Sequence, residues 1–159
     1  MNRSARTKSA GFTLIELVLV ILILGILGAV AAPRYAEALD ATYARAAAVR
    51  VESDLKYARQ LAQQTSSSKT VTFDIAANRY TLVEVNSRDR TNEDYIVTLT
   101  DDEFNAEINS VDFNGETSVT FDIYGHADNS GTIVVQSGGS IEWEIKIDIL
   151  GQVSVQQLE

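Results

Sequence analysis

Residues 11–16 read Gly11-Phe12-Thr13-Leu14-Ile15-Glu16, and an uncharged run from Leu17 to Ala32 follows them directly. Glu16 is the one charged residue between Phe12 and Ala32. As a helix that rises ~1.5 Å per residue, this segment reaches roughly 31 Å, about the thickness of a bilayer hydrocarbon core. The pattern predicts a transmembrane helix over residues 12–33 with a single carboxylate near its start.

Glu16 raises the question of a cationic partner, because an acidic group costs about 2.5–3.5 kcal/mol at the centre of a membrane helix and less near an end. A newly exposed α-amino group is mostly cationic at neutral pH. Trimming of the chain before Phe12 would therefore supply a partner for this carboxylate. The alternative is that Glu16 extends to the lipid headgroups and pairs with nothing.

The segment resembles the N-terminus of type IV pilins and type II secretion pseudopilins. The resemblance rests on a basic leader, Gly11, the sequence Phe-Thr-Leu-Ile-Glu, the long apolar run and the late proline Pro33. It implies that a prepilin peptidase cuts between Gly11 and Phe12, and that Phe12 becomes the N-methylated first residue. It also implies that Phe12 and Glu16 are subunit-assembly contacts, and that the helix is broken or extended near Pro33 in filaments.

Basic residues flank the apolar run unevenly: Arg3, Arg6 and Lys8 precede it, and Arg34 follows it. This asymmetry predicts a cytoplasmic N-terminus. With the resemblance, it implies a single-pass inner-membrane protein with its C-terminal domain in the periplasm, incorporated into a pseudopilus. A secretory signal ending at residues 29–31 is the rival interpretation, but the uncharged run is longer than the usual 7–15 residues of such signals.

The stretch from residue 34 to 65 predicts an amphipathic stalk helix. It is rich in alanine, the best helix former, and its apolar residues recur every three or four positions. Their mean step exceeds 3.5, which disfavours a coiled-coil seam and favours packing on a sheet. The expected stripe is Tyr35, Leu39, Tyr43, Ala47, Val51, Leu55, Ala58 and Ala62.

Residues 66–159 alternate apolar and polar side chains, which predicts seven or eight β-strands. Three hairpins are expected, with turns at residues 76–78, at Asn114-Gly115 and at Gly138-Gly139. In the strand of residues 140–149, the apolar side chains up to Ile149 are expected to face the core. The predicted fold class is α+β: a long N-terminal helix, transmembrane and then amphipathic, packed on an antiparallel β-sandwich-like domain, as in pilins.

Further motifs in the chain are looser: Ala58-Arg59, Ala62, residues 71–75 and 79–82, Phe121 with Gly125, residues 131–135 and residues 145–155. They resemble the GspH/FimT group of minor pseudopilins and minor pilins, which carry two antiparallel sheets on the helix. The chain has Gly151-Gln152 where the group often has glycine-arginine. Together with the N-terminal resemblance, this implies a prepilin leader at 1–11, a transmembrane helix at 12–33, a stalk at 34–65 and a periplasmic β domain at 66–159.

The net charge of −9 is unlike that of a nucleic-acid binder, which usually presents a basic patch. Loss of the three basic residues of the leader lowers it to near −12. The chain has no cysteine, so it forms no disulfide; this favours pseudopilins over type IV pilins, many of which have one. The basic residues beyond the stalk are Lys69, Arg79, Arg88, Arg90 and Lys146.

No catalytic residue, cofactor or metal ligand set is expected. The sequence has no Ser/His/Asp spacing of weight, no glycine-rich phosphate loop and no metal-ligand cluster. His126, the only histidine, is expected in an exposed turn. Asp122, Asp128 and Asn129 offer oxygens that suit calcium, but their spacing is not that of an EF-hand.

The function expected from these features is that of a structural minor pseudopilin of a type II secretion pseudopilus, which assembles through its N-terminal helix to support protein export. The expected partners are the prepilin peptidase, other pseudopilins or pilins in a filament, and the inner membrane; nucleic acid is not expected. The alternative is a minor type IV pilin of the FimT/FimU type that primes pilus assembly or takes part in DNA uptake. A membrane-tethered enzyme has no support beyond a foldable domain.

Overall fold

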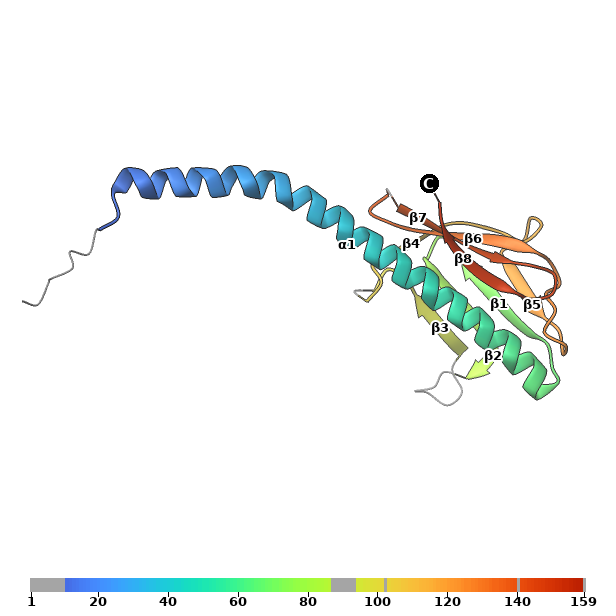
Figure 1. Cartoon of the computed structure of the whole chain (residues 1–159). Coiled ribbons are helices and arrows are strands. Elements are labelled where there is room, and N and C mark those ends of the chain that lie inside the picture. Colours follow the sequence, from blue (N-terminus) through green and yellow to red (C-terminus); the bar gives the residue numbers. More distant parts are fainter. Residues whose placement is uncertain (1–10, 87–93, 102, 140, 159) are drawn as a thin grey trace, which may run out of the picture. The chain divides into compact units, whose positions relative to one another are not determined.

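The computed structural model of the chain describes residues 11–86, 94–101, 103–139 and 141–158. Over these residues, one long helix, α1 (Leu14–Thr65), is followed by eight strands (Figure 1). The chain divides into two units, Met1–Ala36 and Glu37–Glu159. The buried apolar residues all lie in the second unit, between Ala44 and Ile147.

In the first unit, every described residue is exposed. By length and composition, α1 is able to cross a membrane, and none of its apolar window is buried by other parts of the chain. Pro33 lies inside α1, and the helix continues through it without interruption. The helix ends at Thr65, and Ser66 takes a left-handed conformation with φ 49°.

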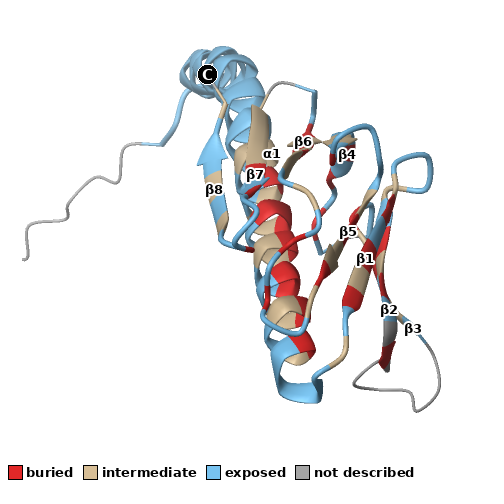
Figure 2. Ribbon diagram, turned by 90° about the vertical axis from the view of Figure 1, so that its right-hand side faces the viewer, coloured by how far each residue is buried: buried red, intermediate tan, exposed pale blue. Residues whose placement is uncertain are grey.

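In the second unit, α1 buries one face in the core, which Figure 2 shows as a stripe along the helix. This confirms the predicted stripe from Ala47 onward, because Val51, Leu55, Ala58 and Ala62 are all buried. Small alanines let the helix backbone approach the sheets closely. The stripe does not extend to Tyr35 and Leu39, which are exposed.

The first sheet has the strand order β3-β2-β1-β5 and is antiparallel throughout. Its strands are β1 (Lys69–Asp74), β2 (Arg79–Asn86), β3 (Asp94–Thr98) and β5 (Ser118–Phe121). Val71 of β1 is paired with Leu82 of β2 and with Val119 of β5, and all three side chains are buried. The alternation of apolar and polar residues in β1 therefore matches the face that packs on the core.

The second sheet has the order β4-β6-β7-β8 and is also antiparallel. Its strands are β4 (Glu107–Asp112), β6 (Gly131–Ser137), β7 (Ile141–Ile147) and β8 (Val153–Gln157). The register places Ile133 opposite Ile145, and both are fully buried. The expected hairpins at residues 76–78 and at Gly138-Gly139 are confirmed by the β1–β2 and β6–β7 pairings.

The hairpin expected at Asn114-Gly115 was wrong. The turn forms, with φ 58° and 91° at these residues, but pairing stops at one bridge between Phe113 and Glu116. Strand β4 then pairs with β6 in one sheet, and β5 pairs with β1 in the other. An Asn-Gly signal specifies a local reversal, whereas the partner of each strand depends on which sheet covers its apolar face.

Ile149 also departs from the expectation that it faces the core. Strand β7 ends at Ile147, and Ile149 lies in the turn that follows, with 54% of its surface exposed. The sequence alternation continues past the end of the strand, so periodicity alone did not locate the boundary.

Candidate functional site

The start of α1 is fixed by a local capping interaction. The backbone N–H of Glu16 donates to the hydroxyl Oγ1 of Thr13 at 3.2 Å. Thr13 directly precedes the first helical residue, Leu14, so it occupies the N-cap position. A threonine followed three residues later by glutamate is the pattern of a capping box, which sequence reasoning overlooked. The Thr13 hydroxyl therefore satisfies one of the free N–H groups of the first helical turn.

The residues predicted for processing and assembly lie at or near the helix start. Gly11 and Phe12 precede α1, and Phe12 exposes 77% of its surface. Glu16 lies in the first turn and is exposed. Pro33 is 17 positions further along and does not join this group. Cleavage, methylation and the assembly contact of Glu16 remain predictions at this point.

The apolar part of α1 has a shallow hollow along one side, lined by Val18, Ile21, Leu22, Gly25, Ile26 and Ala29. Gly25 and Ala29 are four residues apart and therefore lie on the same face. Small residues at this spacing let helices approach closely in a membrane. The sequence analysis did not single out this pair.

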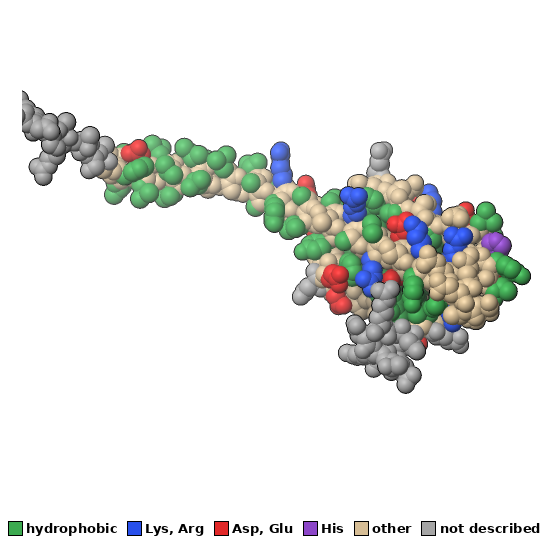
Figure 3. All heavy atoms as spheres, turned by 60° about the horizontal axis from the view of Figure 1, so that its bottom comes forward, with side chains coloured by type: hydrophobic (Ala, Val, Ile, Leu, Met, Phe, Trp, Pro, Cys, Tyr) green, Lys and Arg blue, Asp and Glu red, His purple; other side chains and the backbone are tan. Residues whose placement is uncertain are grey.

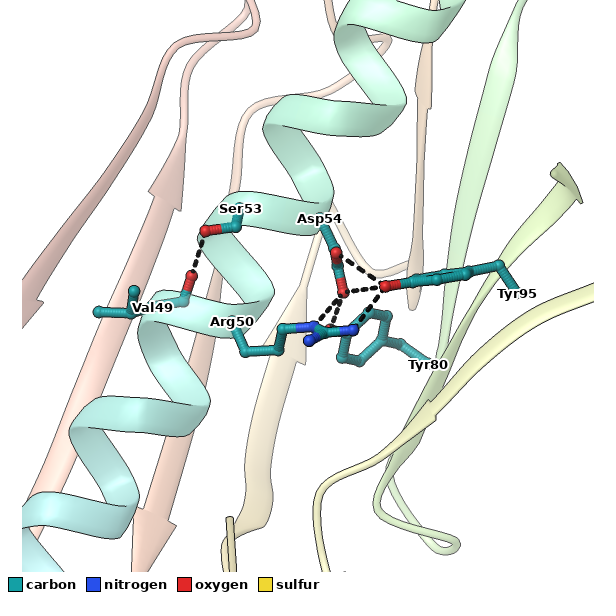
Figure 4. Close-up of polar contacts among 6 residues, drawn as sticks. All are labelled: Val49, Arg50, Ser53, Asp54, Tyr80 and Tyr95. Carbon is teal, nitrogen blue, oxygen red and sulfur yellow. Dashed lines mark hydrogen bonds and ion pairs between the residues drawn. The ribbon is translucent and has the colours of Figure 1, made fainter. Parts of the chain in front are cut away.

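A buried polar network joins α1 to the first sheet (Figure 4). Asp54 on α1 accepts hydrogen bonds from the hydroxyl of Tyr80 on β2 at 2.6 Å and from Nε of Arg50 at 2.9 Å. The hydroxyl of Tyr95 on β3 donates to the same carboxylate at 3.1 Å, and Arg50 donates to Tyr95 at 2.6 Å. The carboxylate thus accepts hydrogen bonds from three side chains and ties α1 to β2 and β3.

The network shifts the pKa values of its members. Burial, with the negative charge of Asp54 second, raises the pKa of the Tyr80 hydroxyl far above its ordinary value. Burial is also the main cause of a raised pKa at Tyr95. At Arg50, partial burial lowers the pKa, but the hydrogen bond and charge of Asp54 outweigh this and keep it raised. All three groups therefore hold their protons at neutral pH.

The residues considered for calcium are engaged in backbone turns. Asp122 Oδ1 accepts from the N–H groups of Tyr124 and His126, and Asp128 Oδ1 accepts from those of Thr120 and Asn129. Among the described residues, no group of three or more His, Asp or Glu side chains is placed to hold a metal ion. The side chain of His126 is 53% exposed, in a turn as expected.

The three described basic residues beyond the stalk are buried or paired with carboxylates. Lys69 is buried, Arg79 pairs with Asp74 at 3.1 Å, and Lys146 pairs with Glu144 at 2.9 Å. Arg88 and Arg90 lie outside the described residues.

Two family models match the sequence. The model of the prokaryotic N-terminal methylation motif matches residues 6–32, and that of the type II transport protein GspH matches residues 47–151. No curated protein matches it.

Among solved structures, the chain is similar to the minor pseudopilin EpsH from the type 2 secretion system of Vibrio cholerae. The identity is 13% and the TM-score 0.55, over 72% of this chain and 96% of that chain. It is also similar to the type IV minor pilin FimU of Pseudomonas aeruginosa in two crystal forms. For these, the identity is 14% and 15% and the TM-score 0.53 and 0.52, over 70% and 71% of this chain and 91% and 87% of theirs. At these identities, the likeness concerns the fold.

A long N-terminal helix that carries a methylation motif and packs on two antiparallel sheets defines a pilin-type subunit, as the sequence predicted. Within that class, the GspH model covers well over half of the chain. The chain belongs to the type II transport protein GspH family.

Proposed function

We propose that the chain is a structural minor pseudopilin of a type II secretion pseudopilus, and that it assembles through its N-terminal helix to support protein export. The observation that carries this proposal is the GspH match at residues 47–151 downstream of the methylation motif at residues 6–32. The first unit adds support, since its apolar helix is uncovered and long enough to span a membrane.

In this proposal, a prepilin peptidase cuts between Gly11 and Phe12 and the new N-terminus at Phe12 is methylated. The ammonium group then pairs with Glu16 of its own or a neighbouring chain. An unpaired charge in a low-dielectric site is strongly destabilising, by about 3–5 kcal/mol when one partner of a buried pair is removed. This free-energy difference between the unpaired and the paired carboxylate drives subunits to associate in register. Separately, Pro33 provides a weak point in the helix.

The proposed topology is a single pass with the N-terminus in the cytoplasm. Residues 1–11 form the leader, 12–33 the transmembrane helix, 34–65 the stalk and 66–159 the periplasmic domain. The three basic residues before the apolar run support this orientation. The partners are the prepilin peptidase, the inner membrane and other pseudopilins of the filament.

A minor type IV pilin is the second candidate, because the TM-scores to FimU (0.53 and 0.52) are close to that for EpsH (0.55). Such a subunit would prime pilus assembly or take part in DNA uptake. Deletion of the gene separates the two candidates: loss of exported enzymes with intact pili supports the pseudopilin, and loss of pili with intact export supports the pilin.

We propose no enzymatic activity and no cofactor. The support is that Asp54, the buried carboxylate of the network, has its oxygens occupied by donors from Arg50, Tyr80 and Tyr95. These hydrogen bonds tie α1 to β2 and β3, which is a structural role.

The test compares Glu16→Gln with Thr13→Val in a host with the full secretion system. Glu16→Gln removes the charge and keeps a side chain that suits the capping box, whereas Thr13→Val removes the capping hydroxyl and keeps the charge. We expect both variants to be processed to Phe12, and the glutamine variant to enter filaments at least about tenfold less than the valine variant. The measurements are the mass of the mature N-terminus and the amount of subunit in sheared filaments.

Two results would count against the proposal. One is retention of residues 1–11, or an N-terminus near Ala32, in cells whose prepilin peptidase is active. The other is equal incorporation of the two variants, which would mean that the charge of Glu16 has no part in assembly.

A further inference from the structure

The second unit contains two turns of the same sequence type and the same geometry. One is Asp122–His126, with the sequence Asp-Ile-Tyr-Gly-His, and the other is Asp148–Gln152, with the sequence Asp-Ile-Leu-Gly-Gln. In each, the fifth residue donates its N–H to the aspartate Oδ1 at 2.8 Å. In each, the glycine N–H donates to the aspartate carbonyl at 2.9 Å, and the aspartate N–H donates to the carbonyl of the fifth residue.

The two turns lie side by side although 26 positions separate them in sequence. The N–H of Ala127, just after the first turn, donates to the carbonyl of Ile149 in the second at 3.2 Å. Both also lie against the last turns of α1. There, Arg59 Nε donates to the carbonyl of Gly125 at 3.1 Å, and Gln63 Nε2 donates to that of Tyr124 at 2.7 Å. The pair is thus fixed to the helix.

The second and third residues of each turn point their apolar side chains into solvent. We call Ile123, Tyr124, Ile149 and Leu150 the twin-turn patch; they expose 42%, 69%, 54% and 56% of their surfaces. They are four of the nine large apolar residues that are exposed among the described residues after Ala36. Figure 3 shows apolar side chains gathered beside the histidine at this end of the unit.

The backbone under the patch is rigid, so a partner meets a preorganised surface and little ordering cost is added on binding. The N–H of His126 is the main cause of a lowered pKa at Asp122, so this carboxylate stays ionised and keeps its turn closed. Side chains that are held outward by two matched turns, and that nothing in the described chain covers, are the kind of apolar patch that marks an interaction site.

Charges of both signs border the patch. A small groove adjoins it, lined by Lys56, Arg59, Gln60, Gln63, Gln152 and Val153. Lys56 pairs with Glu52 at 2.6 Å, and the two turns contribute the carboxylates of Asp122 and Asp148. The complementary surface is therefore defined by the apolar side chains of the patch.

The size of the patch indicates how the partner is held. Four side chains offer far less than the ~800 Å² per partner of a stable protein–protein interface. The contact is too small to form a lasting complex in solution, and becomes effective when a second attachment keeps the partner close. Helix packing in a filament is such an attachment.

We propose that the twin-turn patch is a contact surface for the globular domain of a neighbouring pilin-type subunit, which presents apolar side chains to it. The inference rests on the proposed function, because the filament supplies the second attachment. Beyond the proposed function, the inference states that this end of the β domain, as well as the N-terminal helix, determines which subunit binds next to this one.

The test is site-specific photocrosslinking of the full chain in cells that make the whole filament. A photoreactive phenylalanine analogue replaces Tyr124 or Leu150, and Ile96 on β3, 53% exposed, is the matched control position. We expect positions 124 and 150 to give adducts with another pilin-type subunit, identified by mass spectrometry, at about tenfold the yield of position 96. We expect Glu16→Gln to lower the yield of these adducts about tenfold, in step with its lower incorporation.

Yields at positions 124 and 150 that equal the control, in cells where the subunit enters filaments normally, would overturn the inference and leave the proposed function intact. Adducts with lipid or with exported cargo in place of a subunit would also overturn it. Normal incorporation of Glu16→Gln would instead point to failure of the proposed function. As a second measurement, the double variant Tyr124→Ser with Leu150→Ser should keep the far-ultraviolet circular dichroism of the parent and enter filaments about tenfold less.

Discussion

Asp54 is a charged residue type at a buried position. Its residue surface is only 7% exposed, although aspartate is seldom buried without partners. The partners come from three elements: Arg50 from the preceding helical turn, Tyr80 from β2 and Tyr95 from β3. A buried charge that is paired and hydrogen-bonded in this way ties the elements together, because separating them leaves it unpaired.

Tyr80→Phe tests this network through its pH dependence. At neutral pH, loss of the hydroxyl removes one hydrogen bond to a charged group, which is expected to lower the free energy of unfolding by about 1.5–3 kcal/mol. The raised pKa of Tyr80 means that the folded protein keeps this proton after the unfolded chain, with a tyrosine pKa of about 10, begins to lose it. Wild-type stability from Tyr80 is thus complete below pH ~10 and is lost progressively above it.

The phenylalanine variant has no such loss, so its deficit relative to wild type should shrink by about 1.4 kcal/mol between pH 7 and pH 11. Urea unfolding at the two pH values measures this. Tyr124→Phe, at an exposed tyrosine, is the control and should leave both values near wild type. A deficit that is the same at both pH values would show that Tyr80 ionises equally in the folded and unfolded states.

At the scale of elements, α1 serves two environments with one continuous helix. Apart from Glu16, its start is apolar and uncovered, and its later half has one alanine-rich face in the core. The first part of the helix is patterned to contact a membrane, and the second part is patterned to contact a sheet.

The turns between strands determine how closely elements approach each other, and Gly151 shows this clearly.

Gly151→Ala and Gly139→Ala separate steric contact from backbone strain. The two glycines have nearly the same conformation, with φ 72° and 71°. A Cβ at Gly151 would overlap the carbonyl oxygen of Gly125, whereas one at Gly139 meets nothing within 4 Å. Both variants bear a backbone cost of about 1–2 kcal/mol, and Gly151→Ala should lose about 1–3 kcal/mol more from overpacking.

Thermal unfolding of the two purified variants checks this difference. Equal transition temperatures would mean that the twin turns adjust to the extra methyl group, and that their close approach is not needed for stability.

At the scale of the molecule, the core is confined to the second unit. Among the described residues, all buried apolar ones lie between Ala44 and Ile147, so residues 11–36 contribute nothing to it. A chain that begins at Glu37 should therefore be soluble without detergent, and its transition temperature should lie within about 3 °C of the full chain. Because the twin-turn patch is small, this fragment should also be monomeric at micromolar concentration.

Circular dichroism and size-exclusion chromatography of the fragment measure both properties. A fragment that requires detergent, or that melts far below the full chain, would show that the apolar helix supports the fold of the β domain.

Several features were readable from the chain because they depend on neighbours within a few residues. The apolar run after Phe12 predicts a membrane helix from composition and length alone. The stalk stripe from Ala47 to Ala62 follows from helical periodicity, and the turns at residues 76–78 and at Gly138-Gly139 follow from local conformation. The capping-box pattern of Thr13 and Glu16 and the repeated sequence Asp-Ile-x-Gly are also local patterns in the sequence. The sequence analysis did not predict the helix cap or the two turns from them.

Tertiary structure alone decided which segments meet. The strands on either side of Asn114-Gly115 separate into different sheets, β4 pairing with β6 and β5 with β1, and strand pairing depends on packing against such distant neighbours. The burial of Asp54 depends on tyrosines 26 and 41 positions away. The two Asp-Ile-x-Gly turns likewise become one surface only in the folded domain. Contacts between distant residues depend on how all the apolar surfaces of the chain pack together. A pattern within a few residues contains no information about that packing.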